Sequence, residues 1–285
     1  MQKYNFNSDP VQRPAILKTM PDLTWWPAPE PDISSSVALL DPIGLDVMAS
    51  VALLDRVETK YVFHERRLAG ILAALTAEYR VLEINEGRLN HYRTLYFDTA
   101  DFALFRRHQG GGRNRYKVRS RSYIDTDLSF LEVKHKMKQN RTVKNRIRTA
   151  DFVDRLTSET SDFLSAHLPP NTWRLTPKLW NEYTRITLVS KRNPERVTLD
   201  LNLQFQRGEK TMALPGIVIA EVKQPGVAAD SAFVRLMREL VIRPSGFSKY
   251  CIGVSMLYPD VKHNHFKPTL RLVGKLIQGG EYHVQ

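Results

Sequence analysis

The chain has little of what several protein classes require. Its 285 residues include a single cysteine, Cys251, which excludes an intramolecular disulfide and any metal site built from several cysteines. Because such a sequence suits a reducing compartment, we expect a cytoplasmic protein. No stretch approaches the roughly 18 uncharged apolar residues of a membrane-spanning helix. The N-terminal segment MQKYNFNSDPVQRP has no apolar core, so no secretory signal is expected.

Common signatures of nucleophilic and phosphate-binding chemistry are also absent. The sequence has no nucleophile elbow, and its one glycine run, at 110–112, lacks the Gly-Lys-Ser/Thr context of a P-loop. That run is more typical of a turn.

Positive charge, by contrast, is abundant. The 42 Lys and Arg residues exceed the 30 Asp and Glu residues, which gives a net charge of +12. This excess favours a polyanionic partner, such as nucleic acid, an anionic membrane, a nucleotide or polyphosphate. Segment 113–148 holds twelve basic and three acidic residues. Because apolar residues such as Val118, Leu131 and Val133 are interspersed there, the segment predicts folded strands rather than a basic tail.

The pattern along the chain predicts three regions. Residues 1–36 are rich in proline and predict an extended leader, residues 37–260 form the main domain, and residues 261–285 are a tail without a clear pattern. Strand patterns joined by short turns dominate the main domain and predict an α+β fold with a largely antiparallel sheet. Strands are expected at 56–63, 92–98, 113–123, 128–137, 141–148, 178–189, 196–205 and 217–223. Helices are expected at 43–49, 65–79, 101–108, 151–168 and 229–241, whereas 248–257 fits a strand or a helix.

Several predicted strands share an unusual polar face. Successive strand residues point to opposite sides, so five basic side chains share one face of segment 113–121. Cations and carboxylates are mixed in other strands, as in Glu58 with Lys60 and Glu221 with Lys223. One such strand would be an ordinary solvated face. The same mixture on many strands favours a closed barrel with a polar lumen for a long polyanion, and carboxylates there suit Mg²⁺ or Mn²⁺ bridging phosphate oxygens.

Nine short motifs follow one another in an order that carries a family resemblance. They are R-V-E-T-K-Y at 56–61, Y-F-D-T at 96–99, K-V-R-S-R-S-Y at 117–123, F-L-E-V-K-H-K at 130–136, V-K-N-R at 143–146, N-E-Y-T-R at 181–185, R-V-T-L-D at 196–200, E-V-K at 221–223 and F-S-K-Y at 247–250. Over about residues 40–258, the sequence resembles the VTC (vacuolar transporter chaperone) catalytic domain. That domain is a polyphosphate polymerase of the triphosphate tunnel metalloenzymes, which are related to the CYTH proteins.

The resemblance implies a tunnel-shaped, closed antiparallel barrel of about eight strands, with a basic lumen and helices packed outside. It implies an ATP:polyphosphate phosphotransferase of the polyphosphate kinase type, which moves the γ-phosphoryl group of ATP to a growing inorganic polyphosphate chain and needs Mn²⁺ or Mg²⁺. ATP and polyphosphate are then the partners, without nucleic acid or a membrane span. The catalytic cations implied by the motifs are Lys60, Arg119, Arg121, Lys134, Arg185 and Lys249. Further phosphate-binding residues are Lys117, Lys144, Arg146, Arg196 and Lys223. The implied metal ligand is Glu221, with Glu58 and Glu132 as helpers.

Two other functions would use the same features. A tunnel triphosphatase would pass the phosphoryl group to water, although K-V-R-S-R-S-Y and F-S-K-Y resemble the VTC branch more than the general CYTH pattern. A non-catalytic polyanion or RNA binder would need the cations but not Glu221. Such binders usually expose a basic stripe with stacking aromatics, whereas the residues alternating with the cations here are mostly small or aliphatic. The sequence does not indicate the adenine-binding residues, the product length, the metal preference or the oligomeric state.

Overall fold

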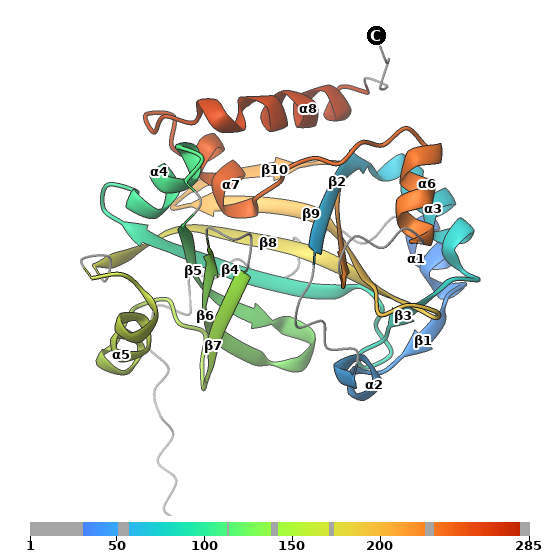
Figure 1. The fold of residues 1–285 in the computed structure, drawn as a ribbon, viewed down its shortest axis with the longest axis horizontal. Helices are drawn as coiled ribbons and strands as arrows, with labels where there is room; N and C mark the ends of the chain where they lie inside the picture. Colours follow the sequence, from blue (N-terminus) through green and yellow to red (C-terminus); the bar gives the residue numbers. More distant parts are fainter. Residues whose placement is uncertain are drawn as a thin grey trace, which may run out of the picture. The chain divides into compact units, whose positions relative to one another are not determined.

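The computed structural model describes residues 31–50, 57–112, 114–137, 142–170, 174–225 and 231–279. The chain divides into a unit of residues 1–30, which lies outside the described residues, and a second unit, Pro31–Gln285, which contains every element named below. The second unit consists of one eleven-stranded sheet and the helices packed against it (Figure 1). All its strand pairs are antiparallel except one between two short strands, which confirms the predicted α+β class and largely antiparallel sheet.

Eight strands form the main path of the sheet, in the order β2-β11-β9-β8-β4-β5-β6-β7. They are β2 (Val57–His64), β4 (Asn90–Thr99), β5 (Arg115–Tyr123), β6 (Leu128–Lys136), β7 (Thr142–Thr149), β8 (Leu175–Ser190), β9 (Arg196–Arg207) and β11 (Ile217–Gln224). Three short strands lie off this path, namely β1 (Asp41–Ile43), β3 (Tyr79–Leu82) and β10 (Lys210–Leu214). The prediction missed these three because strands of three to five residues are too short to show a clear alternation.

The edges of the sheet differ from the predicted closed barrel. Strands β2 and β7 end the path, and within the described part of the chain no backbone ladder joins them. The sheet is curved all the same, because Lys134 on β6 reaches Glu58 on β2, with 3.0 Å between Nζ and Oε2. A side-chain ion pair, rather than a backbone ladder, thus links this part of the sheet to β2. The predicted closure is therefore corrected to an open strand path bridged by side chains.

Helices cover the apolar outer face of the sheet in two places. Helices α1 (Pro31–Ala38), α3 (Leu68–Leu75) and α6 (Ala232–Glu239) pack over β2, β9 and β11, where alternate residues such as Val197 and Val218 are buried (Figure 1). Helices α4 (Ala103–Gln109) and α5 (Ser158–His167) pack over β4, β5 and β6 around Phe97, Val118 and Leu131. Because strand residues alternate, burying the apolar face on the outside directs the charged face inward.

C-terminal helices fill part of the inner face. Helix α7 (Lys249–Leu257) buries Tyr250 and Val254 in the same core as the inner-face residues Tyr96 and Phe205. Helix α8 (Lys267–Ile277), in the tail whose pattern was left unassigned, adds Val273 to that core. Segment 248–257 fitted either a strand or a helix because seven of the nine α7 residues are buried, so no amphipathic period is visible.

Other element boundaries also differ from the predicted ones. Helix α1 begins at Pro31, within the predicted leader 1–36. The predicted helix 65–79 ends at Leu75 and is followed by β3. The predicted helix 151–168 forms only as α5, after a capping box between Thr157 and Thr160. The remaining short elements are α2 (Leu45–Ser50), η3 (Glu65–Arg67), η4 (Ile124–Thr126) and η5 (Asn264–Phe266). None of the helices described is long and apolar enough to cross a membrane.

Candidate functional site

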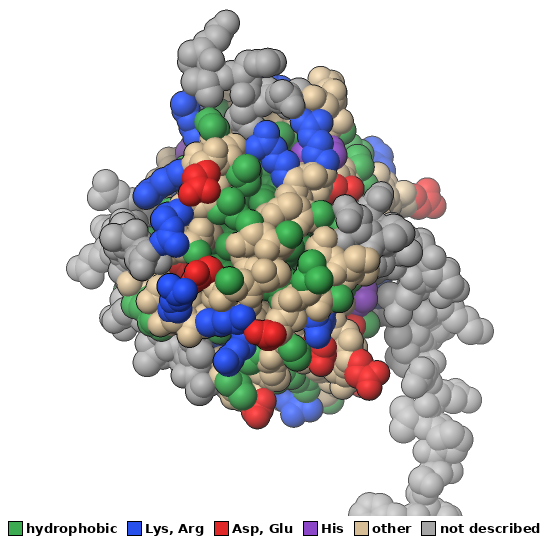
Figure 2. Space-filling model, turned by 90° about the vertical axis from the view of Figure 1, so that its right-hand side faces the viewer, with side chains coloured by type: hydrophobic (Ala, Val, Ile, Leu, Met, Phe, Trp, Pro, Cys, Tyr) green, Lys and Arg blue, Asp and Glu red, His purple; other side chains and the backbone are tan. Residues whose placement is uncertain are grey.

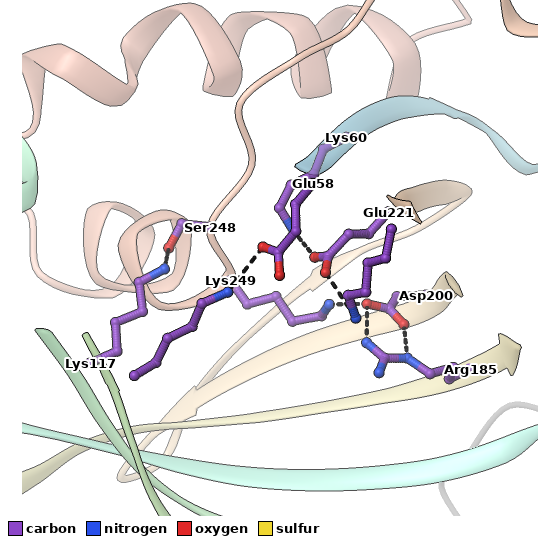
Figure 3. A network of polar contacts seen from close by, with 10 residues as sticks. Glu58, Lys60, Lys117, Arg185, Asp200, Glu221, Ser248 and Lys249 are labelled. Carbon is purple, nitrogen blue, oxygen red and sulfur yellow. Dashed lines mark hydrogen bonds and ion pairs between the residues drawn. The ribbon is translucent and has the colours of Figure 1, made fainter. Parts of the chain in front are cut away.

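The basic residues predicted from the motifs lie mainly on the inner face of the sheet. On the face shown in Figure 2, Lys and Arg side chains are spread among acidic and apolar ones rather than gathered in one patch. On the inner face of the sheet, cations and carboxylates from different strands contact one another (Figure 3). These contacts form three clusters, each built around one or two carboxylates.

The first cluster, called here the β2–β11 cluster, consists of Glu58, Lys60, Lys134, Glu221 and Lys223. Pairing of the two strands places Glu221 opposite Lys60 and Lys223 opposite Glu58. The Lys60 ammonium contacts Glu221 Oε2, and Lys223 Nζ lies 3.0 Å from Glu221 Oε1 (Figure 3). Lys134 joins from β6 through Glu58. Two carboxylates are thus surrounded by three ammonium groups.

Electrostatics keep both carboxylates of this cluster ionised. Burial and the neighbouring Glu221 would raise the pKa of Glu58, but the surrounding lysines outweigh both effects and lower it. Burial likewise opposes ionisation of Glu221, yet Lys223 and Lys60 hold its pKa well below the usual range. A divalent cation such as Mg²⁺ is commonly held by one or two carboxylates together with phosphate oxygens. Glu58 and Glu221 therefore supply a donor set that fits Mg²⁺ or Mn²⁺.

The second cluster, called the Asp200 cluster, lies where β8, β9 and the start of α7 meet. Arg185 binds Asp200 with two parallel hydrogen bonds, Nε to Oδ1 at 2.6 Å and Nη2 to Oδ2 at 2.9 Å. The Lys249 ammonium contacts the same Oδ2 and lies 4.2 Å from the ring centre of Tyr183. Tyr183 stacks on Tyr92 at a centroid distance of 5.1 Å. Burial opposes ionisation of Asp200, but Arg185 and Lys249 lower its pKa nonetheless. Burial lowers the pKa of Lys249 to about 7.

The third cluster, called the Glu132 cluster, connects β5, β6 and β7. Arg119 Nε and Nη2 each lie 2.7 Å from Glu132 Oε2, and the Lys144 ammonium contacts Oε1. Glu132 is 1% exposed. Burial would raise its pKa, but Arg119, Arg121 and Lys144 lower it far more. Burial lowers the pKa of Lys144 to about 7. Nearby, Arg121 Nε donates to Thr94 Oγ1 at 3.3 Å.

Three predicted phosphate-binding residues lie outside these clusters. Lys117 Nζ donates to Ser248 Oγ at 2.8 Å, and burial lowers its pKa to about 8. Arg196 Nη2 donates to the Met48 carbonyl at 3.2 Å. Arg146 is exposed on the edge strand β7, and its guanidinium lies 4.5 Å from the ring centre of Phe130. Lys117 therefore lies beside the Asp200 cluster at the start of α7.

The structure separates the predicted metal ligands. Glu58 and Glu221 share a cluster, whereas Glu132 is enclosed by Arg119 and Lys144. Among the residues described, no group of three or more His, Cys, Asp and Glu side chains could hold a metal ion. The predicted set of three carboxylates is thus not assembled, because Glu132 faces the cations of its two neighbouring strands.

Two site residues escaped the sequence reasoning. Asp200 is the last residue of the motif R-V-T-L-D and lies on the same strand face as Arg196. A single acidic residue on a polar strand face, as at Glu221, is the sequence feature that could have identified it as a site residue. Ser248 lies in F-S-K-Y, where a serine before a helical run is typical of an N-cap. Its Oγ accepts from the Cys251 backbone N–H at 3.2 Å.

One comparison with known proteins confirms the family resemblance of the motifs. A family model described as the VTC domain matches residues 55–258. The comparison with curated proteins finds no match. Among solved structures, a candidate adenylate cyclase from Bacillus halodurans is 14% identical, with a TM-score of 0.44 and coverage of 72% of this chain and 97% of that chain. A candidate adenylyl cyclase from Hippeastrum, described as having a dominant triphosphatase activity, is 14% identical, with a TM-score of 0.42 and coverage of 70% and 95%.

Proposed function

The chain belongs to the VTC domain family, and from this membership we propose that it is a triphosphate-tunnel enzyme that transfers the γ-phosphoryl group of ATP to inorganic polyphosphate. The observation that carries this proposal is the inner face of the sheet. Cations from β2, β5, β6, β8, β11 and the start of α7 are held there in fixed positions by internal carboxylates. A linear chain of phosphates is the ligand that such a surface fits best.

Fixed cations bind and orient the phosphates. A guanidinium has five N–H donors, and Arg185 uses two of its nitrogens on Asp200, so other N–H groups stay available for a phosphate oxygen. The lysine ammonium groups act as point charges beside these guanidinium groups. Because Glu132 and Asp200 hold the guanidinium groups of Arg119 and Arg185 before substrate arrives, these two groups need little reorganisation when charge develops on the transferring group.

A divalent cation fits the β2–β11 cluster, with Glu221 and Glu58 as its protein ligands, and when bound it would neutralise charge on the phosphate oxygens near the bond that breaks. Lys60, Lys134 and Lys223, which contact these carboxylates in the free protein, would then be released toward phosphate oxygens. The cluster thus brings positive charge to one place along the bound phosphates. This placement favours transfer at that point of the chain.

No side-chain nucleophile is required by this reaction. The acceptor is the terminal phosphate oxygen of the growing chain, which is anionic at neutral pH, so neither a serine nor a general base has to be activated. Phosphoryl transfer depends mainly on in-line positioning and charge stabilisation. The absence of a nucleophile elbow in the sequence agrees with this chemistry.

The test is incubation of the purified chain with ATP and Mn²⁺, followed by a gel stained for polyphosphate and by assays of ADP and free phosphate. We expect a polyphosphate ladder with a matching amount of ADP. Glu221→Gln should abolish turnover but keep polyphosphate binding, whereas the control Glu209→Gln, at an exposed position, should leave both unchanged. Free phosphate without polymer would make the enzyme a triphosphatase. Metal-independent polyanion binding without either product would leave a binding module.

A further inference from the structure

Asp200 lies between Arg185 on β8 and Lys249 at the start of α7. The motifs assign both of these cations to phosphate binding. Asp200 accepts two hydrogen bonds from Arg185 and contacts the Lys249 ammonium through Oδ2 (Figure 3). Its side chain is 4% exposed, and the side chains of Arg185 and Lys249 are 15% and 12% exposed. Within the described part of the chain, Arg185 and Lys249 are the two side chains that donate to this enclosed carboxylate. Asp200 therefore acts on a ligand only through its neighbours.

The surroundings of Lys249 make its positive charge costly. Burial is the main cause that lowers its pKa to about 7, and the like charges of Arg185 on β8 and Lys60 on β2 also lower it. The Tyr183 ring lies below the ammonium group, and Lys117 contacts Ser248, the residue before Lys249. Asp200 opposes these effects, because its negative charge and its hydrogen bond both raise the pKa of Lys249.

We propose that Asp200 is a positioning residue that favours the protonated form of Lys249 and holds the Arg185 guanidinium in place, so that both can present charged donors to a phosphate oxygen. This inference rests on the proposed function, since it assigns a role within the same phosphate-binding face. The bidentate contact fixes the plane of the guanidinium. The contact with Oδ2 fixes the ammonium at the first residue of α7. Asp200 itself touches no substrate.

The test is the affinity for tripolyphosphate, measured by calorimetry without metal from about pH 6 to about pH 9. In Asp200→Asn, Lys249 loses its counter-ion and should be neutral at a lower pH than in the wild type. The ratio of the variant's dissociation constant to that of the wild type should therefore be about tenfold or more at about pH 6, where mainly the wild-type ammonium is charged and its interaction is lost in the variant. The ratio should shrink toward about pH 9, where Lys249 is neutral in both proteins. Titration of the ligand and of the other lysines cancels in this ratio.

Two further variants separate positioning from folding. Asp200→Glu keeps the carboxylate, so its affinity ratio should not depend on pH. The double variant Asp200→Asn with Lys249→Arg carries a cation that stays charged, so the pH dependence of the ratio should disappear. Lys249→Arg alone should flatten the wild-type profile even if Asp200→Asn does not fold.

The outcomes are distinguishable. A ratio that is the same at every pH, or a Lys249→Arg profile as steep as the wild type, would overturn the role of Asp200. Failure of the wild type to bind tripolyphosphate at any pH would overturn the proposed function as well. A pH-dependent ratio without turnover would support Asp200 while removing only the transfer activity.

Discussion

Replacing Glu132 with glutamine tests whether this residue is an internal counter-ion or a metal ligand. Its carboxylate is 1% exposed and contacts Arg119 and Lys144. Removing one partner of a buried ion pair leaves the others uncompensated and costs about 3–5 kcal/mol. Glutamine keeps one acceptor oxygen for Arg119, so we expect a loss near the lower limit, about 3 kcal/mol.

Thermal unfolding of the metal-free protein measures this loss. For a unit of this size, about 3 kcal/mol corresponds to a melting temperature lower by roughly 6–12 °C. The matched control is Glu78→Gln, whose carboxylate pairs with the exposed Arg192 at 3.2 Å and should cost at most about 1 kcal/mol. Tripolyphosphate should restore more stability to Glu132→Gln than to the wild type, because its oxygens replace the missing counter-ion.

The pH dependence of this difference follows from the pKa of Glu132. Its cationic neighbours lower this pKa from the ordinary value of 4.5. A lowered folded-state pKa contributes stability that is fully present above 4.5 and is lost as the pH falls toward the folded-state pKa. The difference in the free energy of unfolding between the wild type and Glu132→Gln should therefore be largest at neutral pH and should shrink below pH 4.5. Unchanged stability combined with weaker Mn²⁺ binding would refute this reasoning and restore Glu132 as a metal ligand.

Two further predictions concern α7 packing and the inner lysines. In Gly253→Ala the new Cβ would lie 2.7 Å from Phe205 Cδ1, so urea unfolding should show a free energy of unfolding lower by roughly 1–3 kcal/mol. In Gly274→Ala in α8 the new Cβ meets nothing within 4 Å, so the free energy of unfolding should rise by roughly 0.5–1 kcal/mol. Equal effects of the two substitutions would contradict the packing of α7. Burial lowers the pKa of Lys117 to about 8 and of Lys144 to about 7. The affinity for tripolyphosphate should therefore fall as the pH rises through these values. Because arginine stays charged, Lys117→Arg and Lys144→Arg should each bind tripolyphosphate more tightly than the wild type at about pH 9 but not at about pH 6.

Alternation predicted the strands well because the two faces of this sheet differ so strongly. On β5, Lys117, Arg119 and Arg121 face inward while Val118 and Ser120 are buried on the other side, and this period of two is visible without a structure. The same period places the predicted inner residues of β2 and β11 on one face, where the two strands pair.

Elements without a period were not predictable. Helix α7 is buried nearly all round, so its sequence did not distinguish it from a strand. Closure of the barrel depends on how two distant edges meet, and local pattern carries no information on that. Glu132 and Glu221 look alike in the sequence, since each precedes a valine and a lysine. Only the register of the neighbouring strands distinguishes them. Glu132 faces an arginine of β5 and a lysine of β7, whereas Glu221 faces one lysine of β2 and one of β11.

The inner carboxylates explain how so basic a surface persists without ligand. A buried cation stays charged only if a partner offsets its desolvation. In the three clusters seven cations contact four carboxylates, namely Glu58, Glu132, Asp200 and Glu221. The surplus of three positive charges is a modest one, so an entering phosphate chain exchanges with internal partners rather than meeting bare cations. Such an exchange limits the net gain on binding, which favours release of a growing chain over its permanent capture.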